Sequence, residues 1–128
     1  MRNRGLSNLA FLFAVAVLLL AAAAFVLVRA RAERPVLDTP YHAVVLSNGT
    51  VYFGRLEGLG TPFPVLREVY YVQSAVNPET KAVNNVLVKR GKEWHGPDRM
   101  ILNAQNIVFI EPVGRDSKVA QLIADSKK

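Results

Sequence analysis

The stretch "AVVLSNGTVYFGRLEG", Ala43–Gly58, decides the fold of the downstream part of this chain. Two runs rich in β-branched and aromatic residues flank the dipeptide Asn48-Gly49. This dipeptide favours the positive φ angles of a type I′ turn, so the stretch predicts a β-hairpin. Asn48-Gly49-Thr50 also matches a glycosylation sequon, but the turn accounts for the same residues. Gly54 lies inside the second strand and predicts a sharp bend or a close backbone approach.

The sequence after this hairpin predicts further short strands separated by turns. The expected strands are Val65–Ser74, Val86–Arg90, Arg99–Asn103 and Asn106–Pro112. Ala75–Asn85 predicts a polar connection with a turn at Asn77-Pro78, and a tight corner must join the last two strands. Five or six short strands in residues 41–113 predict a small antiparallel barrel, because closing the sheet removes exposed edges.

The C-terminal residues 114–128 predict a short amphipathic helix. Asp116 or Ser117 can cap its N-terminus, and Val119, Leu122 and Ile123 form one apolar stripe. The fold class expected for this part of the chain is therefore mainly β with flanking helices.

An uncharged run of 23 residues, 6–28, follows a basic N-terminal tail, residues 1–5. As a helix it would be roughly 34 Å long, enough to cross a hydrocarbon core of about 30 Å. The alternative is a cleaved signal peptide, since "ARA", Ala30–Ala32, satisfies the small-x-small rule for cleavage. The apolar run is longer than the usual core of a signal peptide, which favours a single-pass anchor in the cytoplasmic (inner) membrane.

A charged linker bracketed by Pro35 and Pro40, residues 29–40, connects the apolar run to the β domain. Arginines lie on both sides of the run, so the positive-inside rule gives no single answer. The arginines are Arg2, Arg4, Arg29, Arg31 and Arg34, and the acidic residue Glu33 lies between the last two. The signal-like start favours an N-terminus inside and a C-terminal domain outside the cytoplasm.

Small residues recur at helical spacing along the apolar run, at Ala10, Ala14, Val17, Ala21 and Ala24. A face of small residues allows two membrane helices to approach closely. This face predicts helix–helix packing and a homo-oligomer. The alternative is that alanine is simply frequent in apolar helices.

Charge and composition limit the classes of function. The chain has no cysteine, which excludes disulfides, thiol nucleophiles and thiolate metal sites. The net charge of +6 is concentrated around the apolar run, since eleven basic and nine acidic residues follow Pro35. The nearly balanced charge of the domain makes nucleic acid an unlikely partner.

Two motifs resemble those of Sm-like and SH3-like small barrels: "VVLSNGTVYFGRLEG" and "MILNAQNIVFIE". The resemblance implies a small barrel whose strand edges support assembly. The Asp, Asn and Arg-Gly residues with which Sm proteins contact RNA are missing, because the corresponding segments read "GLGTPFP" and "NAQN". The apolar N-terminal run followed by "AVVLSNGTVYFGRL", "VYYVQ" and "VKRGKEWHGPDRMILN" also resembles, over nearly the whole chain, an uncharacterised family of small bacterial single-pass membrane proteins. This resemblance implies the architecture but no mechanism.

The segment "VKRGKEWHGPDRM", Val88–Met100, holds the candidate binding residues. They are Lys89, Arg90, Lys92, Trp94, His95 and Arg99. A basic loop with a tryptophan can contact anionic lipid headgroups, an acidic partner or nucleic acid. The favoured alternative is structural: Trp94 packs into one end of the barrel and Gly96-Pro97 turns the chain.

A catalytic or metal site is not indicated by the spacing of the reactive residues. The two histidines, His42 and His95, lie more than fifty residues apart, whereas zinc needs three or four convergent ligands. No serine has a nucleophile context, and no cofactor is expected. The sequence therefore predicts a membrane-anchored interaction or scaffold module, an accessory component of an envelope complex or a self-assembling oligomer. The alternatives are a cytoplasm-facing Sm-like nucleic-acid binder and an enzyme with His95 in its site.

Overall fold

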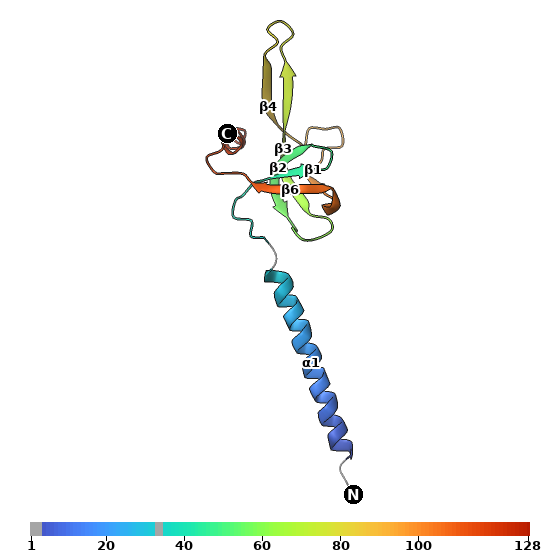
Figure 1. The fold of residues 1–128 in the computed structure, drawn as a ribbon. Coiled ribbons are helices and arrows are strands. Elements are labelled where there is room, and N and C mark those ends of the chain that lie inside the picture. Colours follow the sequence, from blue (N-terminus) through green and yellow to red (C-terminus); the bar gives the residue numbers. More distant parts are fainter. Residues whose placement is uncertain (1–3, 33–34) are drawn as a thin grey trace. The chain divides into compact units, whose positions relative to one another are not determined.

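The computed structural model describes residues 4–32 and 35–128, and the chain divides into two compact units, Met1–Pro35 and Val36–Lys128 (Figure 1). The first unit is helix α1, Arg4–Ala32. Its large apolar side chains are exposed along its length. By length and composition, α1 could span a membrane, and it is the one helix of the described residues that could.

Helix α1 is longer than the predicted run of residues 6–28. It continues through residues 29–32, which the sequence assigned to the linker, because alanine and arginine are good helix formers. Pro35 lies just beyond the helix, as expected for a residue that disfavours helix before it. The predicted linker residues Glu33 and Arg34, and Arg2 in the basic tail, lie outside the described residues.

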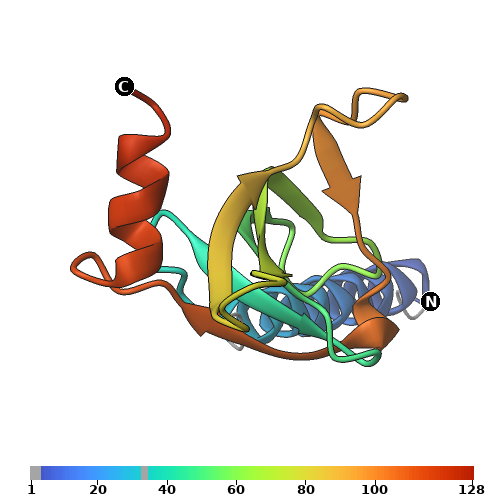
Figure 2. The same ribbon diagram turned by 90° about the horizontal axis from the view of Figure 1, so that it is seen from above.

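The second unit is an antiparallel sheet followed by a short helix (Figures 1 and 2). The strands are β1 His42–Leu46, β2 Val51–Glu57, β3 Val65–Val76, β4 Val83–Lys89, β5 Arg99–Ile101 and β6 Ile107–Pro112, with the 3₁₀ turn η1 Ala104–Asn106 and helix α2 Lys118–Asp125. The strand order is β4-β3-β2-β1-β6, and β5 also pairs with β3. The expected fold class, mainly β with flanking helices, is confirmed.

The sheet does not close into a barrel. The corner between β5 and β6 bonds back to the loop before β3, since Leu102 N donates to Pro64 O at 2.8 Å and Ala104 N to Pro62 O at 3.0 Å. In the described part of the chain, β5 and β6 do not pair, so β4 and β6 remain edge strands. The domain is therefore an open, loosely barrel-like sheet. The expectation that a closed barrel removes exposed strand edges was wrong.

The predicted β1–β2 hairpin is confirmed, but its turn type differs from the expectation. Gly49 N donates to Leu46 O at 2.9 Å, and Gly49 has a φ of 82° while the φ of Asn48 is not positive. This is a type I turn followed by a left-handed glycine, the usual three-residue hairpin loop, rather than type I′. Asn48 instead accepts a hydrogen bond from Thr50 N through its side chain, at 3.0 Å.

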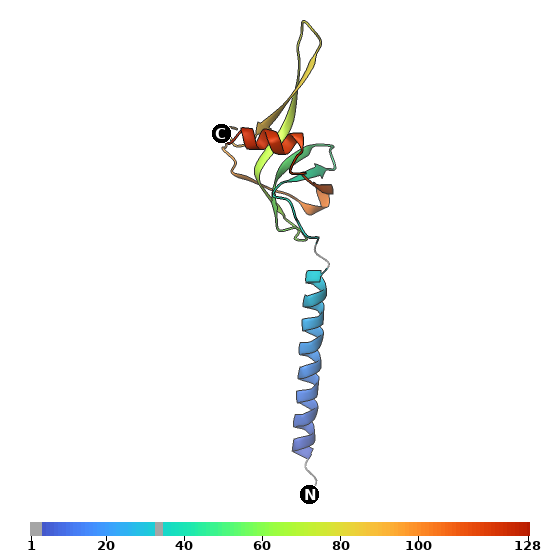
Figure 3. The same ribbon diagram turned by 90° about the vertical axis from the view of Figure 1, so that its left-hand side faces the viewer.

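Strands β3 and β4 extend beyond the rest of the sheet as a two-stranded ribbon, residues 71–88, which we call the arm (Figure 3). The sequence predicted a polar connection over residues 75–85, and this was wrong at both ends, because pairing continues to Val76 opposite Val83. The turn at Asn77 is confirmed, since Asn77 N donates to Ala82 O at 2.9 Å. A side-chain hydrogen bond between Ser74 and Asn85, at 2.7 Å, supports the polar middle of the ribbon.

Two apolar clusters hold the sheet together. One contains Val44, Leu56, Leu66, Val69 and Leu102, and the other contains Tyr41, Tyr70, Val113 and Ile123. Helix α2 packs on the second cluster through Val119 and Ile123 of its predicted stripe. Ser117 is its cap, since its Oγ accepts from Ala120 N at 3.1 Å.

Candidate functional site

The six candidate residues from the sequence lie along the connection between β4 and β5. Lys89 ends β4 and Arg99 begins β5, while Lys92, Trp94 and His95 lie on the loop between them. Arg90 N donates to Val69 O at 2.8 Å, so Arg90 still follows the β3–β4 ladder. The candidate residues are therefore close together in the sequence, but strand alternation can direct their side chains to opposite faces of the sheet.

Glu93 fixes the conformation of this loop. Its carboxylate accepts from Arg90 Nε and from Gly91 N, both at 2.7 Å. The hydrogen bond from Arg90 and those from the backbone lower the pKa of Glu93 to about 2. Gly96 N then donates to Glu93 O at 2.7 Å, which closes a turn with Trp94 and His95 at its central positions.

Trp94 is fully exposed, with a relative accessibility of 108%. The interpretation that it packs into the end of the barrel was therefore wrong, because the central positions of a turn point away from the sheet that carries it. The buried aromatic residues of the domain are instead Tyr41 and Tyr70, of which Tyr70 is 1% exposed. Trp94 is free to contact something outside the described residues of this chain.

The basic residues near Trp94 do not form one patch. Arg90 pairs with Glu93 and Arg99 lies 3.6 Å from Asp98, so each has a carboxylate close by. Lys89 Nζ lies 6.0 Å from the centre of the Tyr70 ring, whereas Arg90 Cζ lies 5.8 Å from that of Tyr52. The two adjacent residues therefore contact opposite sides of the sheet, as strand alternation requires.

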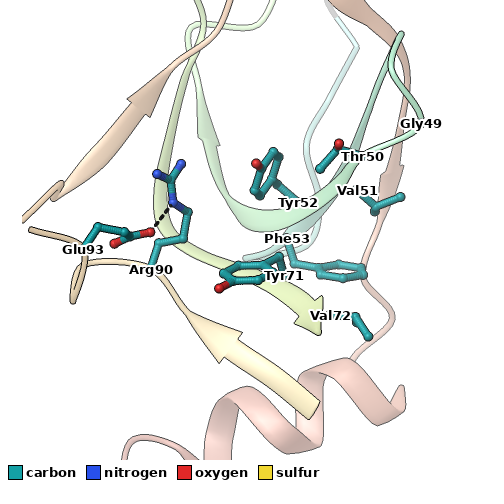
Figure 4. Close-up of a pocket in the computed structure, with 9 residues that line it drawn as sticks. All are labelled: Gly49, Thr50, Val51, Tyr52, Phe53, Tyr71, Val72, Arg90 and Glu93. Atoms are coloured by element: carbon teal, nitrogen blue, oxygen red, sulfur yellow. Dashed lines mark hydrogen bonds and ion pairs between the residues drawn. The ribbon is translucent and has the colours of Figure 1, made fainter. Parts of the chain in front are cut away.

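Arg90 reaches a cleft of about 640 Å³ that opens where β2 and β3 separate (Figure 4). The two strands pair as far as Phe53 and Tyr70, and beyond this point β2 follows β1 while β3 follows β4. The cleft is lined by Gly49, Thr50, Val51, Tyr52, Phe53, Tyr71, Val72, Arg90 and Glu93. The Tyr52 and Tyr71 rings meet edge to face, with their centres 6.4 Å apart. Sequence analysis did not predict this cleft, because it exists only where two strands diverge.

A polar cluster that the sequence did not reveal attaches α2 to the sheet. Tyr41 donates its hydroxyl proton to Glu68, and Lys127 Nζ donates to Tyr41 Oη at 2.7 Å and to Glu68 Oε2 at 3.2 Å. The hydrogen bond from Tyr41 lowers the pKa of Glu68, and burial raises the pKa of Tyr41. Glu68 also has a φ of 48°, an uncommon value for a residue other than glycine.

The histidines do not come together. His42 is 3% exposed on β1, and its Nδ1 has no hydrogen-bond partner, while Nε2 lies 3.3 Å from Thr39 Oγ1. Burial lowers the pKa of His42, and the charge of Asp38 opposes this. His95 is exposed on the turn. Over residues 4–32 and 35–128, no three or more His, Cys, Asp or Glu side chains group as a metal site would require.

The small residues of the predicted packing face lie on α1 and are exposed. They are Ala10, Ala14, Ala21 and Ala24. Their helical spacing places them on one side of α1, as expected from the sequence.

Comparison with known protein families gave no match, and comparison with curated protein sequences gave none either. The geometry of the described residues must therefore indicate the function. Three surface features stand out: the arm, the cleft at its base, and the turn that carries Trp94.

Proposed function

We propose that this chain is a membrane-anchored docking module, which binds a protein subunit through the arm. In this role it is a non-catalytic accessory or scaffold component of a bacterial envelope complex, or a self-assembling oligomer. The observation that carries the proposal is the arm itself: an exposed ribbon whose strands carry no charge, with an unpaired strand edge on each side.

Beside the polar Gln73, Ser74, Asn84 and Asn85, the arm carries apolar side chains that are open to solvent. Val72 is 47% exposed, Val76 60%, Val83 61% and Val86 55%. The strands of the arm contain no charged residue, since its charges, Glu79 and Lys81, lie in the turn. Natural proteins usually protect edge strands with charges, proline or bulges. A two-stranded ribbon is also marginally stable alone, so this one is best explained by a partner that covers it.

The turn with Trp94 supplies a second contact beside the base of the arm. Tryptophan is enriched at protein interfaces because it buries a large area for little loss of conformational freedom. The network around Glu93 holds the turn in place, so ordering this loop costs little on binding. Anionic lipid headgroups are the other candidate for this turn, because Lys92 precedes Trp94 by two residues on the same exposed loop.

The location that we propose is the inner membrane, with α1 as a single-pass anchor and the β domain outside the cytoplasm. The resemblance to small bacterial single-pass proteins supports the anchor, and the resemblance to Sm-like and SH3-like barrels supports an assembly role. Reporters active on one side of the membrane, fused after Lys128, test the orientation. Activity of the cytoplasmic reporter would contradict it and would call for a direct RNA-binding test of the domain.

The two other functions are less well supported by the geometry. Nucleic-acid binding needs converging cations, whereas Arg90 and Arg99 each have a carboxylate of their own nearby. An enzyme with His95 needs a group that orients the imidazole. In the described part of the chain, His95 has no hydrogen-bond or ion-pair partner.

Photo-crosslinking in native membranes tests the proposal. A photoreactive residue replaces Gln73 on the arm, and a matched variant carries it at Gln105, which is exposed on η1 beside the loop before β3, at the end of β3 opposite to the arm. We expect one protein adduct of defined mass from position 73 and none from position 105. Failure of position 73 to give a protein adduct would refute docking through the arm.

A further inference from the structure

We propose that the partner of the arm is a second copy of this chain, which pairs antiparallel with the open edge of β3 about a two-fold axis at Ser74. This inference rests on the proposed function and names the partner of the same surface. It follows from which backbone groups face outward, from the registers that symmetry allows, and from the charges at the two ends of the arm.

The outward backbone groups of β3 follow from its pairing with β4. Arg90 N donates to Val69 O at 2.8 Å, and the ladder continues as a regular antiparallel pair to Val76. Since backbone groups alternate sides along a strand, Val69 and every second residue after it face β4. The backbone groups of Val72, Ser74 and Val76 therefore face the other side, which β2 leaves after Tyr70.

Symmetry restricts how two such edges can pair. In an antiparallel pair, two directly opposed residues place their side chains on the same face of the sheet, whereas consecutive residues of one strand place theirs on opposite faces. A residue can therefore lie opposite its own copy, but it cannot lie opposite the copy of its immediate neighbour. The two-fold axis must pass through a residue position. An axis at Gln73 sets Val76 against Tyr70, whose edge is already paired with Phe53. An axis at Ser74 sets Ser74 against itself and Val72 against Val76, and these are the residues whose backbone groups face outward. About six hydrogen bonds then join the two copies.

This register also brings the tip of each arm to the cleft of the other copy. Tyr71 of one protomer is set against Asn77 of its partner, and the tip begins at Asn77. The cleft lies on the same side of β3, beside Tyr71. The charged side chains of the tip are Glu79 and Lys81, and those that line the cleft are Arg90 and Glu93.

These two charge pairs complement each other. Arg90 and Glu93 already pair with each other, at 2.7 Å; Glu79 of one copy can approach the Arg90 guanidinium of the other and Lys81 the Glu93 carboxylate, so that the four charges form one network, repeated across the axis. An interface in which residue i contacts j and j contacts i is what a two-fold dimer requires. Anchoring of both copies in one membrane raises their effective concentration, so a modest ladder suffices.

Single-cysteine variants of the full chain in lipid nanodiscs or detergent test the register, because the chain has no cysteine of its own. Ser74→Cys lies on the proposed axis, where paired Cα atoms are about 5.5 Å apart and can form a disulfide. Asn85→Cys is the matched control, since Asn85 is exposed and directly opposite Ser74 within the arm, but on β4. We expect a disulfide-linked dimer from Ser74→Cys under mild oxidation, far less from Asn85→Cys, and a dimer mass for the unmodified chain.

The opposite results would overturn this inference. No dimer from Ser74→Cys, or equal yields from both variants, would refute pairing through β3 at this register. A monomer mass with a foreign adduct at position 73 in the photo-crosslinking experiment would refute the second copy but retain docking through the arm. Exchanging the tip charges, Glu79→Lys with Lys81→Glu, should weaken the dimer roughly two- to tenfold at low salt, and an unchanged dimer would refute the contact with the cleft.

Discussion

Replacing Gly54 by alanine tests the packing on which the domain depends. A Cβ at Gly54 would lie 2.7 Å from Leu66 Cγ and 2.8 Å from the carbonyl oxygen of Arg67. Leu66 is completely buried, and Arg67 is paired with Arg55, so neither group can move aside without disturbing the sheet. Strands β2 and β3 would have to separate at the point where they are already about to diverge.

The expected loss of stability follows from these contacts. Overpacking a core by one methyl group costs about 1–3 kcal/mol, and a clash with the backbone belongs at the upper end. Alanine recovers about 0.5–1 kcal/mol of the entropic cost of glycine in a strand, which leaves a net loss of about 2 kcal/mol. For a domain of this size, each kcal/mol lowers Tm by roughly 4–8 °C.

Thermal unfolding of the full chain in detergent, followed by the near-ultraviolet circular dichroism of its tyrosines, measures this loss. Gly114→Ala is the matched control, because its Cβ would meet its nearest neighbour, Ser117 Cβ, at 4.0 Å. The control should change stability by less than about 0.5 kcal/mol. If Gly54→Ala were as mild as the control, the close approach of β2 and β3 would be refuted.

Three further predictions concern residues at the surface and in the sheet. Trp94→Ala should change the free energy of unfolding by less than about 0.5 kcal/mol, because the indole is exposed, and a loss of 3 kcal/mol or more in urea unfolding would mean that it is buried. Burial lowers the pKa of His42 in the folded state below 6.5, so the stability that neutral His42 contributes is present above pH 6.5 and is lost as the pH falls through its folded pKa. His42→Val should remove this pH dependence of the free energy of unfolding. The folded pKa of Glu68 is below 4.5, so its contribution is present above pH 4.5 and is lost at lower pH; Glu68→Gln should abolish this loss in acid titrations followed by circular dichroism, and an unchanged acid transition would contradict the role of the cluster with Tyr41 and Lys127.

Local signals in the sequence explain which parts of the fold were predicted correctly. Asn48-Gly49 predicted the hairpin because a left-handed glycine was needed there, although the turn is type I with a bulge. Gly54 predicted a close approach because a missing side chain within a strand usually has a steric reason. Ser117 was one of two expected caps of α2.

Long-range hydrogen bonds explain what the sequence could not predict. Closure of the barrel depends on whether the corner after β5 bonds to β6 or to the loop before β3, and it bonds to Pro62 and Pro64. The cluster of Tyr41, Glu68 and Lys127 joins residues 86 positions apart, so no local pattern indicates it.

The arm and Trp94 were predicted incorrectly for different reasons. Asn84 and Asn85 made the segment read as a polar connection, yet cross-strand pairs with Ala75 and Ser74 hold it in a ladder. Trp94 was expected in the core because large aromatic residues usually lie there, but Glu93 fixes a turn that directs it outward. In both places the part of the structure that differs from expectation is an exposed surface, which is also where we propose that the protein binds its partner.

The most direct test of docking through the arm is amide hydrogen exchange of the full chain in a native-like bilayer. The amides of Val72, Ser74 and Val76 face the open edge of β3, so in an isolated chain they should exchange about as fast as the amide of Lys92 on the exposed loop. Docking through the arm predicts that these three amides become protected while Lys92 does not. Rapid exchange at all three in the membrane would show that nothing pairs with the open edge of β3 and would contradict docking through this edge of the arm.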